Sequence, residues 1–262
     1  MPMADLGDLG LHYQLSGPDS GAPLVLIHAL GTDLRLWDGI LDLLPKGLRV
    51  LRFSLRGHGL SDAPPAPYAM GALVRDVERL MDLLALRDAV VVGLSIGGLV
   101  AQGLAVKRLD LVRALVLSNT AARIGNADIW GQRIALVEAQ GVEAVADATM
   151  ERWFARPFRA TPEARLWRNM VTRTPLAGYL GCSAAIAGAD FYTTTAGLRL
   201  PVLGIAGSED GSTPPDLVRE TLDLVPGSRF VLIRGAGHLP CVDQPQAWAE
   251  AVGQFLQDIG HC

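Results

Sequence analysis

The stretch from Asp88 to Lys107, DAVVVGLSIGGLVAQGLAVK, decides how the rest of the chain is interpreted. It begins with a β-branched apolar run, continues through residues 93–97 (GLSIG), and ends in a segment compatible with a helix. Gly-x-Ser-x-Gly between a strand and a helix is the pattern of a sharp turn that lifts a nucleophilic serine out of a sheet. The flanking glycines let neighbouring backbone pass close to the bend, and the helix N-terminus favours developing negative charge. The pattern therefore predicts that Ser95 is a catalytic nucleophile.

Two other interpretations of this stretch stay open at this point. Residues 89–106 carry no charge and have the minimum length of a membrane span. Their four glycines, a Gln and a Ser, and their β-branched beginning, argue against a span. Alternatively, the pentapeptide arises by chance at an ordinary turn, where Ser95 is only a small residue. A candidate base and acid elsewhere in the chain would favour a catalytic serine over a chance match to the pattern.

Length and composition favour a compact, mildly acidic protein. The chain has 262 residues, of which 50% are hydrophobic, and a formal net charge of -4. This length suits one large α/β domain with or without an insertion, and the charge balance gives no support for nucleic-acid binding. The cysteines Cys182, Cys241 and Cys262 lack a metal-like spacing and suggest reduced thiols. No basic region followed by an apolar one begins the sequence, so we expect a cytoplasmic protein without a secretory signal.

Apolar runs alternate with amphipathic segments along both ends of the chain. The expected strands are 9–15 (an edge strand), 23–28, 49–54, 90–92, 112–118, 201–206 and 229–233, and the expected helices are 34–44, 73–84, 99–106, 216–224 and 246–257. Such alternation predicts a mostly parallel sheet with right-handed crossovers and flanking helices. Ligands of such sheets bind at the carboxyl ends of the strands, where Ser95 falls.

The middle of the chain departs from this alternation. Residues 121–189 contain no strand-like run, and their helical stretches are rich in Trp and Phe and separated by prolines. We expect a helical cap at 121–189, inserted into a core formed by residues 1–120 and 190–262. Ordinary helices that continue the alternation are the other interpretation, but the missing strands argue against it.

A serine nucleophile needs a base and an acid, and the chain offers both after later strands. The base must accept a proton near neutral pH, which selects histidine, and a carboxylate must orient that histidine. His238 lies in a glycine-flanked loop after the last strand, and Asp210 follows the strand before it. The order Ser95, Asp210, His238 agrees with a serine in this kind of strand-turn-helix. Glu209 competes with Asp210 for the acid role.

The remaining histidines and the oxyanion hole can be placed from the same motifs. Two backbone N–H groups are required, one from Ile96 directly after the nucleophile and one from the loop after residues 23–28, for which we expect Leu30. His28 at the beginning of that loop is expected to organise it. His58 is expected to hold its own turn.

The chain resembles the α/β-hydrolase family along essentially its whole length. Within that family it is similar to the bacterial 3-oxoadipate enol-lactonases. The segments that carry the family resemblance are His28–Gly31, Arg56–Ser61, Gly93–Gly98, Gly207–Asp210 and Gly237–His238, and those that carry the narrower one are His28–Trp37, Ser118–Gly125 and Glu151–Phe154. The family acid corresponds to Asp210 rather than Glu209. Two residues depart from the family pattern, namely Ala29 where a glycine is usual and Ser54 where many members have Asp.

The resemblance implies hydrolysis of 3-oxoadipate enol-lactone, a step in aromatic-compound catabolism. The sequence shows no metal-ligand cluster and no phosphate-cradling glycine loop, so we expect no cofactor and no metal. The small-molecule substrate carries a free carboxylate, which in a desolvated site requires a cation or several donors. Arg133 is the expected partner, with Arg152 and Arg123 as further candidates, although each arginine could instead be a solvated or ion-paired surface group. Trp130 and Trp153 are expected to line the pocket, with the cap's own core as the alternative.

Two other functions fit the same residues. One is an aryl or carboxyl esterase, or a cofactor-free perhydrolase, on the same scaffold. The other is a non-catalytic receptor that keeps the pocket, against which the complete set Ser95, Asp210 and His238 argues. We expect neither a membrane nor a nucleic acid as a partner.

Overall fold

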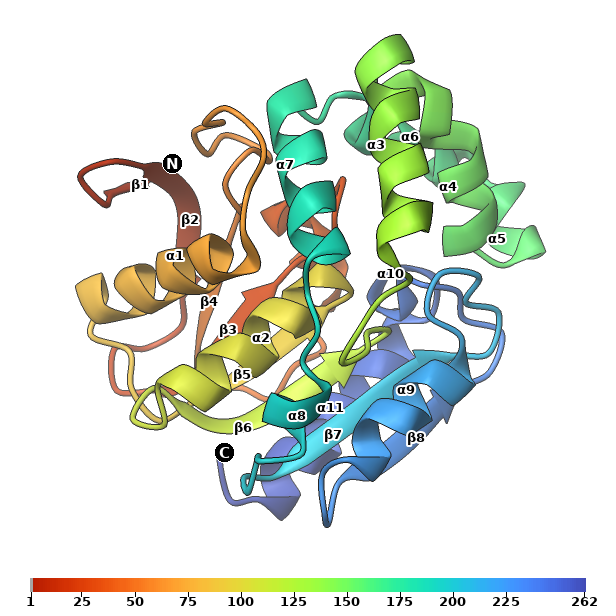
Figure 1. The fold of residues 1–262 in the computed structure, drawn as a ribbon. Helices are drawn as coiled ribbons and strands as arrows, with labels where there is room; N and C mark the ends of the chain where they lie inside the picture. Colours follow the sequence, from red (N-terminus) through yellow and green to blue (C-terminus); the bar gives the residue numbers. More distant parts are fainter. Residues whose placement is uncertain (1) are drawn as a thin grey trace.

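The computed structural model describes residues 2–262, and an eight-stranded sheet lies at its centre (Figure 1). The strand order is β1-β2-β4-β3-β5-β6-β7-β8. Their bounds are β1 Met3–Asp5, β2 Gly10–Ser16, β3 Ala22–Ile27, β4 Leu48–Phe53, β5 Ala89–Leu94, β6 Val112–Ser118, β7 Val202–Gly207 and β8 Arg229–Ile233. Pairs β1–β2 and β2–β4 are antiparallel, and every later pair is parallel. The predicted α/β-hydrolase architecture is therefore confirmed at the level of the sheet.

The central strands are apolar throughout because helices cover both faces of the sheet. Every residue of β5 and of β7 is buried, as expected for parallel strands enclosed on both sides. β3 pairs with β4 on one side and with β5 on the other. The strand that follows β3 in sequence therefore lies on one side of it, and the next strand, β5, lies on its other side. Such a switch point opens a crevice at the carboxyl ends of the strands.

Helices form a layer on each face of this sheet (Figure 1). One layer contains α1 (Met70–Leu83), α2 (Ile96–Lys107) and α9 (Pro215–Asp223), and the other contains the 3-10 helix η1 (Leu34–Ile40) and α11 (Pro245–Asp258). Trp37 of η1 and Trp248 of α11 pack together with ring centroids 5.6 Å apart, and both are fully buried. In the described part of the chain, no helix has both the length and the apolar character needed to cross a membrane. The membrane alternative for residues 89–106 is wrong, because β5 and α2 divide that stretch between them.

Helices connect β6 to β7, and all but the last short one lie at the carboxyl ends of the strands, whereas that last one packs beside α2 (Figure 1). They are α3 (Ala127–Gln140), η2 (Val142–Val145), α4 (Ala146–Trp153), α5 (Arg156–Arg159), α6 (Pro162–Thr172), α7 (Leu176–Ala187) and α8 (Tyr192–Thr195). Phe154 stacks on Phe158 with centroids 4.4 Å apart and also contacts Trp167, so part of this aromatic content forms the helices' own core. Boundaries of a cap at residues 121 and 189 stay a prediction.

Two local predictions were wrong. The segment 9–15 was expected to be an edge strand, but β2 is flanked by β4 and by the three-residue β1, which is the true edge. The segment 34–44 was expected to be helical throughout, but the helix ends at Ile40 and has 3-10 geometry. Leu34, Trp37 and Ile40 are all buried, and their spacing of three residues matches the period of a 3-10 helix.

Candidate active site

Ser95 occupies a strained turn between β5 and α2. Its φ of 58° and ψ of -119° lie in a region that residues with a Cβ rarely adopt. A Cβ on Gly93 would lie 2.2 Å from the carbonyl oxygen of Gly97, and one on Gly97 would lie 2.2 Å from that of Ile27. Both flanking glycines are therefore required by close backbone packing, as predicted. The turn is fixed from β6, since Ser95 N–H donates to the Ser118 carbonyl at 3.1 Å.

Asp210 and His238 form a buried hydrogen-bonded pair. The distance from His238 Nδ1 to Asp210 Oδ2 is 2.9 Å, and the two residues are 2% and 5% exposed, respectively. Burial alone would raise the pKa of the Asp210 carboxyl, but His238 and the amide of Asn119 outweigh burial and hold that pKa below its usual value. Asp210 is therefore ionised and able to orient an imidazole. Glu209, the competing acid, is exposed and contacts the Ser208 hydroxyl instead.

Asp210 is held by donors from the loop after β6 and from its own loop. Asn119, which follows β6, donates from Nδ2 to Asp210 Oδ2 at 2.8 Å and to the Gly237 carbonyl at 3.2 Å. The Thr213 hydroxyl donates to the same carboxylate at 2.8 Å, and its backbone N–H donates at 3.0 Å. These bonds leave the carboxylate little freedom, so its orientation toward His238 is fixed.

The loop that carries His238 is held from both sides. His238 N–H donates to the Trp153 carbonyl at 2.7 Å, and the Trp153 ring stacks on the imidazole with centroids 6.2 Å apart. Gly237 N–H donates to Asp243 Oδ2 at 2.7 Å. Asp243, at the end of α10 (Pro240–Asp243), has its other carboxyl oxygen buried and without a hydrogen-bond partner in residues 2–262. Burial raises the pKa of Asp243 to about 7.

A cavity of about 500 Å³ brings most of the predicted site residues together. Ser95 and His238 both line it, as does Leu30 from the loop after β3. Trp130, Arg133, Arg152 and Trp153 line it from α3 and α4. Its remaining walls are largely apolar, including Ile124, Ile129, Leu136 and Val145. The predicted residues that line this one cavity come from five separate segments of the chain.

Two arginines give this cavity an unbalanced positive charge. Arg133 donates from Nε to the Tyr179 hydroxyl at 2.9 Å and from Nη2 to the Thr149 hydroxyl at 2.8 Å. Burial and the nearby charge of Arg133 lower the pKa of the Arg152 guanidinium. No acidic residue lines the cavity, and within residues 2–262 no carboxylate forms an ion pair with either arginine. Two half-buried cations without a counterion make a site for an anion.

The loop after β3 reaches the cavity through Leu30, whose backbone N–H has no partner in the described residues. Neither Leu30 N–H nor Ile96 N–H donates to another group in the described residues. Gly31, at φ 80°, donates its N–H to His58 Nε2 at 3.1 Å. His58 thus reaches beyond its own turn and supports the loop of Leu30. Ala29, where glycine is usual in the resembling family, is buried and keeps a negative φ, so its methyl group is accommodated.

Two neutral histidines stabilise the base of this loop. His28 accepts the Leu55 N–H at Nε2 (2.8 Å) and donates from Nδ1 to the Ala29 carbonyl (2.8 Å). Burial lowers the pKa of His28 to about 4, and burial together with His28 lowers that of His58 to about 3. Both rings are uncharged at neutral pH and act as fixed hydrogen-bonding groups. Neither lines the cavity that contains Ser95.

Some predicted residues lie elsewhere, and some lining residues were not predicted. Arg123 forms an ion pair with Asp190 (3.6 Å) and does not line the cavity. Tyr179 of α7 lines it but was missed, because nothing in an apolar helix marks one tyrosine as functional. Asn119 was also missed, although its position directly after a buried strand, at the edge where Ser95 lies, is a usable signal. The described residues contain no group of three or more side chains suited to a metal ion.

Known proteins that resemble this chain agree with its fold and motifs. Residues 22–245 match the alpha/beta hydrolase fold family. Over 260 residues the chain is 32% identical to 3-oxoadipate enol-lactonase 2 of Acinetobacter baylyi, covering 95% of this chain and 94% of that protein. The crystal structure of the enol-lactonase from Burkholderia xenovorans LB400 superposes with a TM-score of 0.94 at 35% identity, covering 98% of this chain and 100% of that one.

A third relative is an esterase. The structure of a thermophilic esterase from Thermogutta terrifontis, with malate bound, has a TM-score of 0.90 and 29% identity, covering 96% of this chain and 94% of that one. The relatives thus share the fold and hydrolytic chemistry but differ in substrate. On this basis the protein is a hydrolase, and the chain belongs to the alpha/beta hydrolase fold family.

Proposed function

We propose that the protein opens 3-oxoadipate enol-lactone, or a closely similar anionic lactone, by serine acyl-enzyme chemistry. The observation that carries this proposal is the pair Arg133 and Arg152, which line the cavity of Ser95 without a counterion. A neutral ester gives no reason to keep two half-buried cations there, whereas a substrate carboxylate supplies the missing charge. The Tyr179 hydroxyl accepts from Arg133 and keeps its own proton available as a further donor.

The reacting groups have stated roles in this mechanism. His238 takes the proton of the Ser95 hydroxyl as Ser95 Oγ attacks the lactone carbonyl carbon, while Asp210 stabilises the resulting imidazolium. The N–H groups of Leu30 and Ile96 receive the negative charge that develops on the carbonyl oxygen. Collapse of the tetrahedral intermediate breaks the ring C–O bond, and the departing enol oxygen takes the proton from His238.

The second half of the reaction returns the enzyme to its initial state. His238 removes a proton from water, which attacks the acyl carbon bound to Ser95 Oγ. The C–Oγ bond then breaks, Oγ regains its proton from His238, and the product leaves with a new carboxyl group. The enol formed at ring opening tautomerises to the ketone. The balanced reaction consumes one water molecule and needs no cofactor.

The test compares an anionic lactone with a neutral ester in matched arginine variants. One charge-assisted hydrogen bond contributes about 1.5–3 kcal/mol, so Arg133→Gln should raise KM for the enol-lactone about tenfold to hundredfold. Turnover of p-nitrophenyl acetate should change by less than about threefold. Arg123→Gln is the matched control, because Arg123 lies outside the cavity, and should leave both substrates unaffected. An equal loss on both substrates in Arg133→Gln and Arg152→Gln would dismiss a carboxylate-binding role.

A neutral-ester esterase is the second candidate. The apolar walls of the cavity and the resemblance to the Thermogutta terrifontis esterase support it. The same assay separates the two functions. An esterase should hydrolyse neutral esters at least as efficiently as the lactone, and its kcat/KM should not depend on Arg133.

A further inference from the structure

The loop after β6 contacts the turn of the nucleophile at two points. The Ser118 carbonyl accepts from the Ser95 N–H at 3.1 Å, and the Thr120 hydroxyl donates to the Ser95 carbonyl at 2.6 Å. Asn119, which lies between them in sequence, holds Asp210 instead. The catalytic steps proposed above give roles to Ser95 and Asp210 but none to Thr120, so its hydrogen bond requires an explanation of its own.

The side chain of Thr120 is buried and held in one position. Its relative exposure is 0%. A Cβ on Gly98 would lie 2.3 Å from Thr120 Cγ2 and 2.4 Å from Thr120 Oγ1. Glycine weakens a helix, and Gly98 lies in the first turn of α2. A glycine is required there because Thr120 occupies the space that a Cβ would fill.

The Ser95 carbonyl has enough donors without Thr120. As the first carbonyl of the helix, it accepts the Gly98 N–H at 2.9 Å and the Leu99 N–H at 3.4 Å. The Thr120 hydroxyl adds a third donor from outside the helix. A carbonyl oxygen has two lone pairs, so the hydroxyl is not needed to satisfy a buried acceptor. What it adds is a constraint on the peptide group between Ser95 and Ile96.

This peptide group also carries one of the two donors of the proposed oxyanion hole. The group is trans and planar, so its C=O and its N–H point in opposite directions. Because the carbonyl faces Thr120, the Ile96 N–H points away from Thr120, and it donates to no group in residues 2–262. Hydrogen bonds accepted by a carbonyl polarise its peptide group and strengthen the N–H as a donor.

We propose that Thr120 is a positioning residue for the oxyanion hole. Its hydroxyl fixes the direction of the Ile96 N–H and strengthens that donor as negative charge develops on the substrate carbonyl oxygen. The inference rests on the proposed serine mechanism but not on the identity of the substrate, since every acyl substrate of Ser95 forms such an oxyanion. The gain arises in the transition state, so it should appear in kcat rather than in KM.

Two variants of Thr120 separate its hydroxyl from its shape. Thr120→Val keeps the shape and removes the hydroxyl, and the Ser95 carbonyl retains its two helix donors. Thr120→Val should lower kcat for p-nitrophenyl acetate about tenfold, with KM within about twofold of the wild-type value. Thr120→Ser keeps the hydroxyl and should retain at least about a third of the wild-type kcat.

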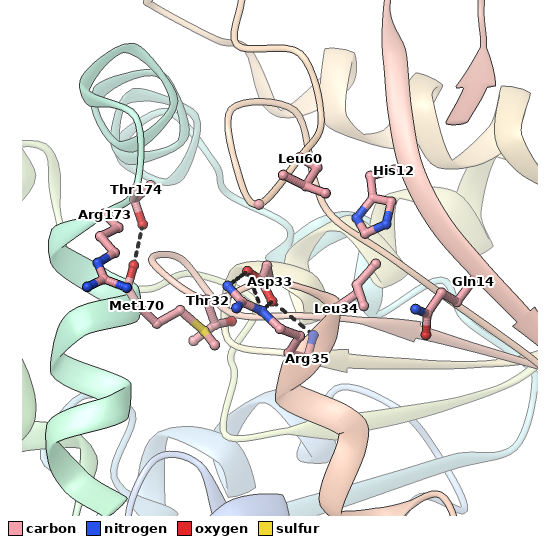
Figure 2. Close-up of a pocket in the computed structure, with 11 residues that line it drawn as sticks. His12, Gln14, Thr32, Asp33, Leu34, Arg35, Leu60, Met170, Arg173 and Thr174 are labelled. Carbon is pink, nitrogen blue, oxygen red and sulfur yellow. Dashed lines mark hydrogen bonds and ion pairs between the residues drawn. The ribbon is translucent and has the colours of Figure 1, made fainter. Parts of the chain in front are cut away.

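Thr174→Val is the matched control. Thr174 follows α6 and lines a separate cavity, of about 410 Å³, that shares no lining residue with the cavity of Ser95 (Figure 2). Its buried hydroxyl donates to the Met170 carbonyl at 3.3 Å. The control therefore also replaces a buried hydroxyl by a methyl group, but away from the nucleophile, and should leave kcat and KM unchanged.

Two further measurements distinguish support of the oxyanion hole from general support of the fold. Addition of Ser95 to benzyl trifluoromethyl ketone gives a tetrahedral alkoxide that occupies the oxyanion hole. The Ki of this inhibitor should rise in Thr120→Val by about the factor by which kcat/KM falls. The apparent pKa in the pH profile of kcat/KM should stay at its wild-type value, because the Thr120 hydroxyl bonds to Ser95 and not to the base His238.

The inference would be overturned if Thr120→Val kept the wild-type kcat and Ki, or if Thr120→Ser were as slow as Thr120→Val. A lower kcat with an unchanged Ki, or with a shifted apparent pKa, would also overturn it. Failure of the proposed function is distinguishable. A wild type that hydrolyses p-nitrophenyl acetate through Ser95, but not the enol-lactone, would contradict only the proposed substrate, whereas an absence of any hydrolysis that depends on Ser95 would overturn both proposals.

Discussion

Asp243 provides a stability test because its carboxyl group is buried beside the loop of His238. Burial raises the pKa of Asp243 to about 7, whereas an aspartate in an unfolded chain has a pKa of about 3.9. Between these values the folded protein keeps a proton that the unfolded chain releases. The free energy of unfolding therefore falls as the pH rises from about 4 toward about 7, because folding then requires a buried charge.

The Asp243→Asn variant removes this titration. It keeps an oxygen for the Gly237 N–H but carries no charge. In the wild type, the free energy of unfolding falls by about 1.4 kcal/mol for each pH unit between pH 5 and the pKa near 7, which is two units. Raising the pH from 5 to 8.5 should therefore stabilise the variant relative to the wild type by about 2–3 kcal/mol. Contributions from His28, His58 and other titrating groups cancel in this comparison.

Urea unfolding of both proteins at pH 5 and pH 8.5 measures the effect directly. Asp42→Asn, at an exposed position, is the control and should change the free energy of unfolding by less than about 0.5 kcal/mol at either pH. The reasoning would be refuted if the free energies of unfolding of Asp243→Asn and the wild type differed by the same amount at both pH values. That result would mean that the carboxyl group of Asp243 does not titrate between pH 5 and pH 8.5.

Two further predictions concern residues that position the reacting groups. His58→Leu removes the acceptor of the Gly31 N–H and should lower kcat about tenfold, because about one hydrogen bond in the oxyanion loop is lost. In steady-state kinetics His58→Gln should retain much of the wild-type kcat. A His58→Gln variant as inactive as His58→Leu would contradict this role of His58. Asn119→Gly can keep the left-handed backbone at this position (φ 48°) but removes a hydrogen-bond donor to Asp210. The kcat of this variant should therefore fall about tenfold, and its KM should stay within about twofold of the wild-type value. An unchanged kcat would show that Asp210 does not need this hydrogen bond.

The sheet could be predicted from sequence because burial on both faces demands unbroken apolar runs. β6 and β8 occupy the predicted residues 112–118 and 229–233, and the other predicted strands begin and end within two residues of the observed ones. β1 could not be predicted, because three residues are too few to show an alternation and their conformation depends on pairing with β2. The 3-10 geometry of η1 was equally hidden, since spacings of three and four residues both suit a helix.

The site was partly predictable for a related reason. Ser95, Asp210 and His238 each follow a strand, so sequence order and strand ends were enough to bring them to one edge of the sheet. The partners of Arg133 depend instead on how α3 packs against α7, which brings the Tyr179 hydroxyl to its guanidinium group. Local sequence carries no record of such tertiary packing. Asp243 was missed as well, because the environment of its carboxyl group depends on how α10 and the loop of His238 fold together.

The central claim is that Ser95 performs hydrolysis on an anionic enol-lactone. The measurement that tests it most directly is the rate of disappearance of enzymatically prepared 3-oxoadipate enol-lactone with purified wild-type protein and with Ser95→Ala. We predict that the wild type consumes the lactone with saturation kinetics and that Ser95→Ala lowers kcat by at least about 10⁴-fold. A wild type that consumes the lactone no faster than buffer does would contradict the proposed substrate. Undiminished turnover by Ser95→Ala would contradict the proposed nucleophile.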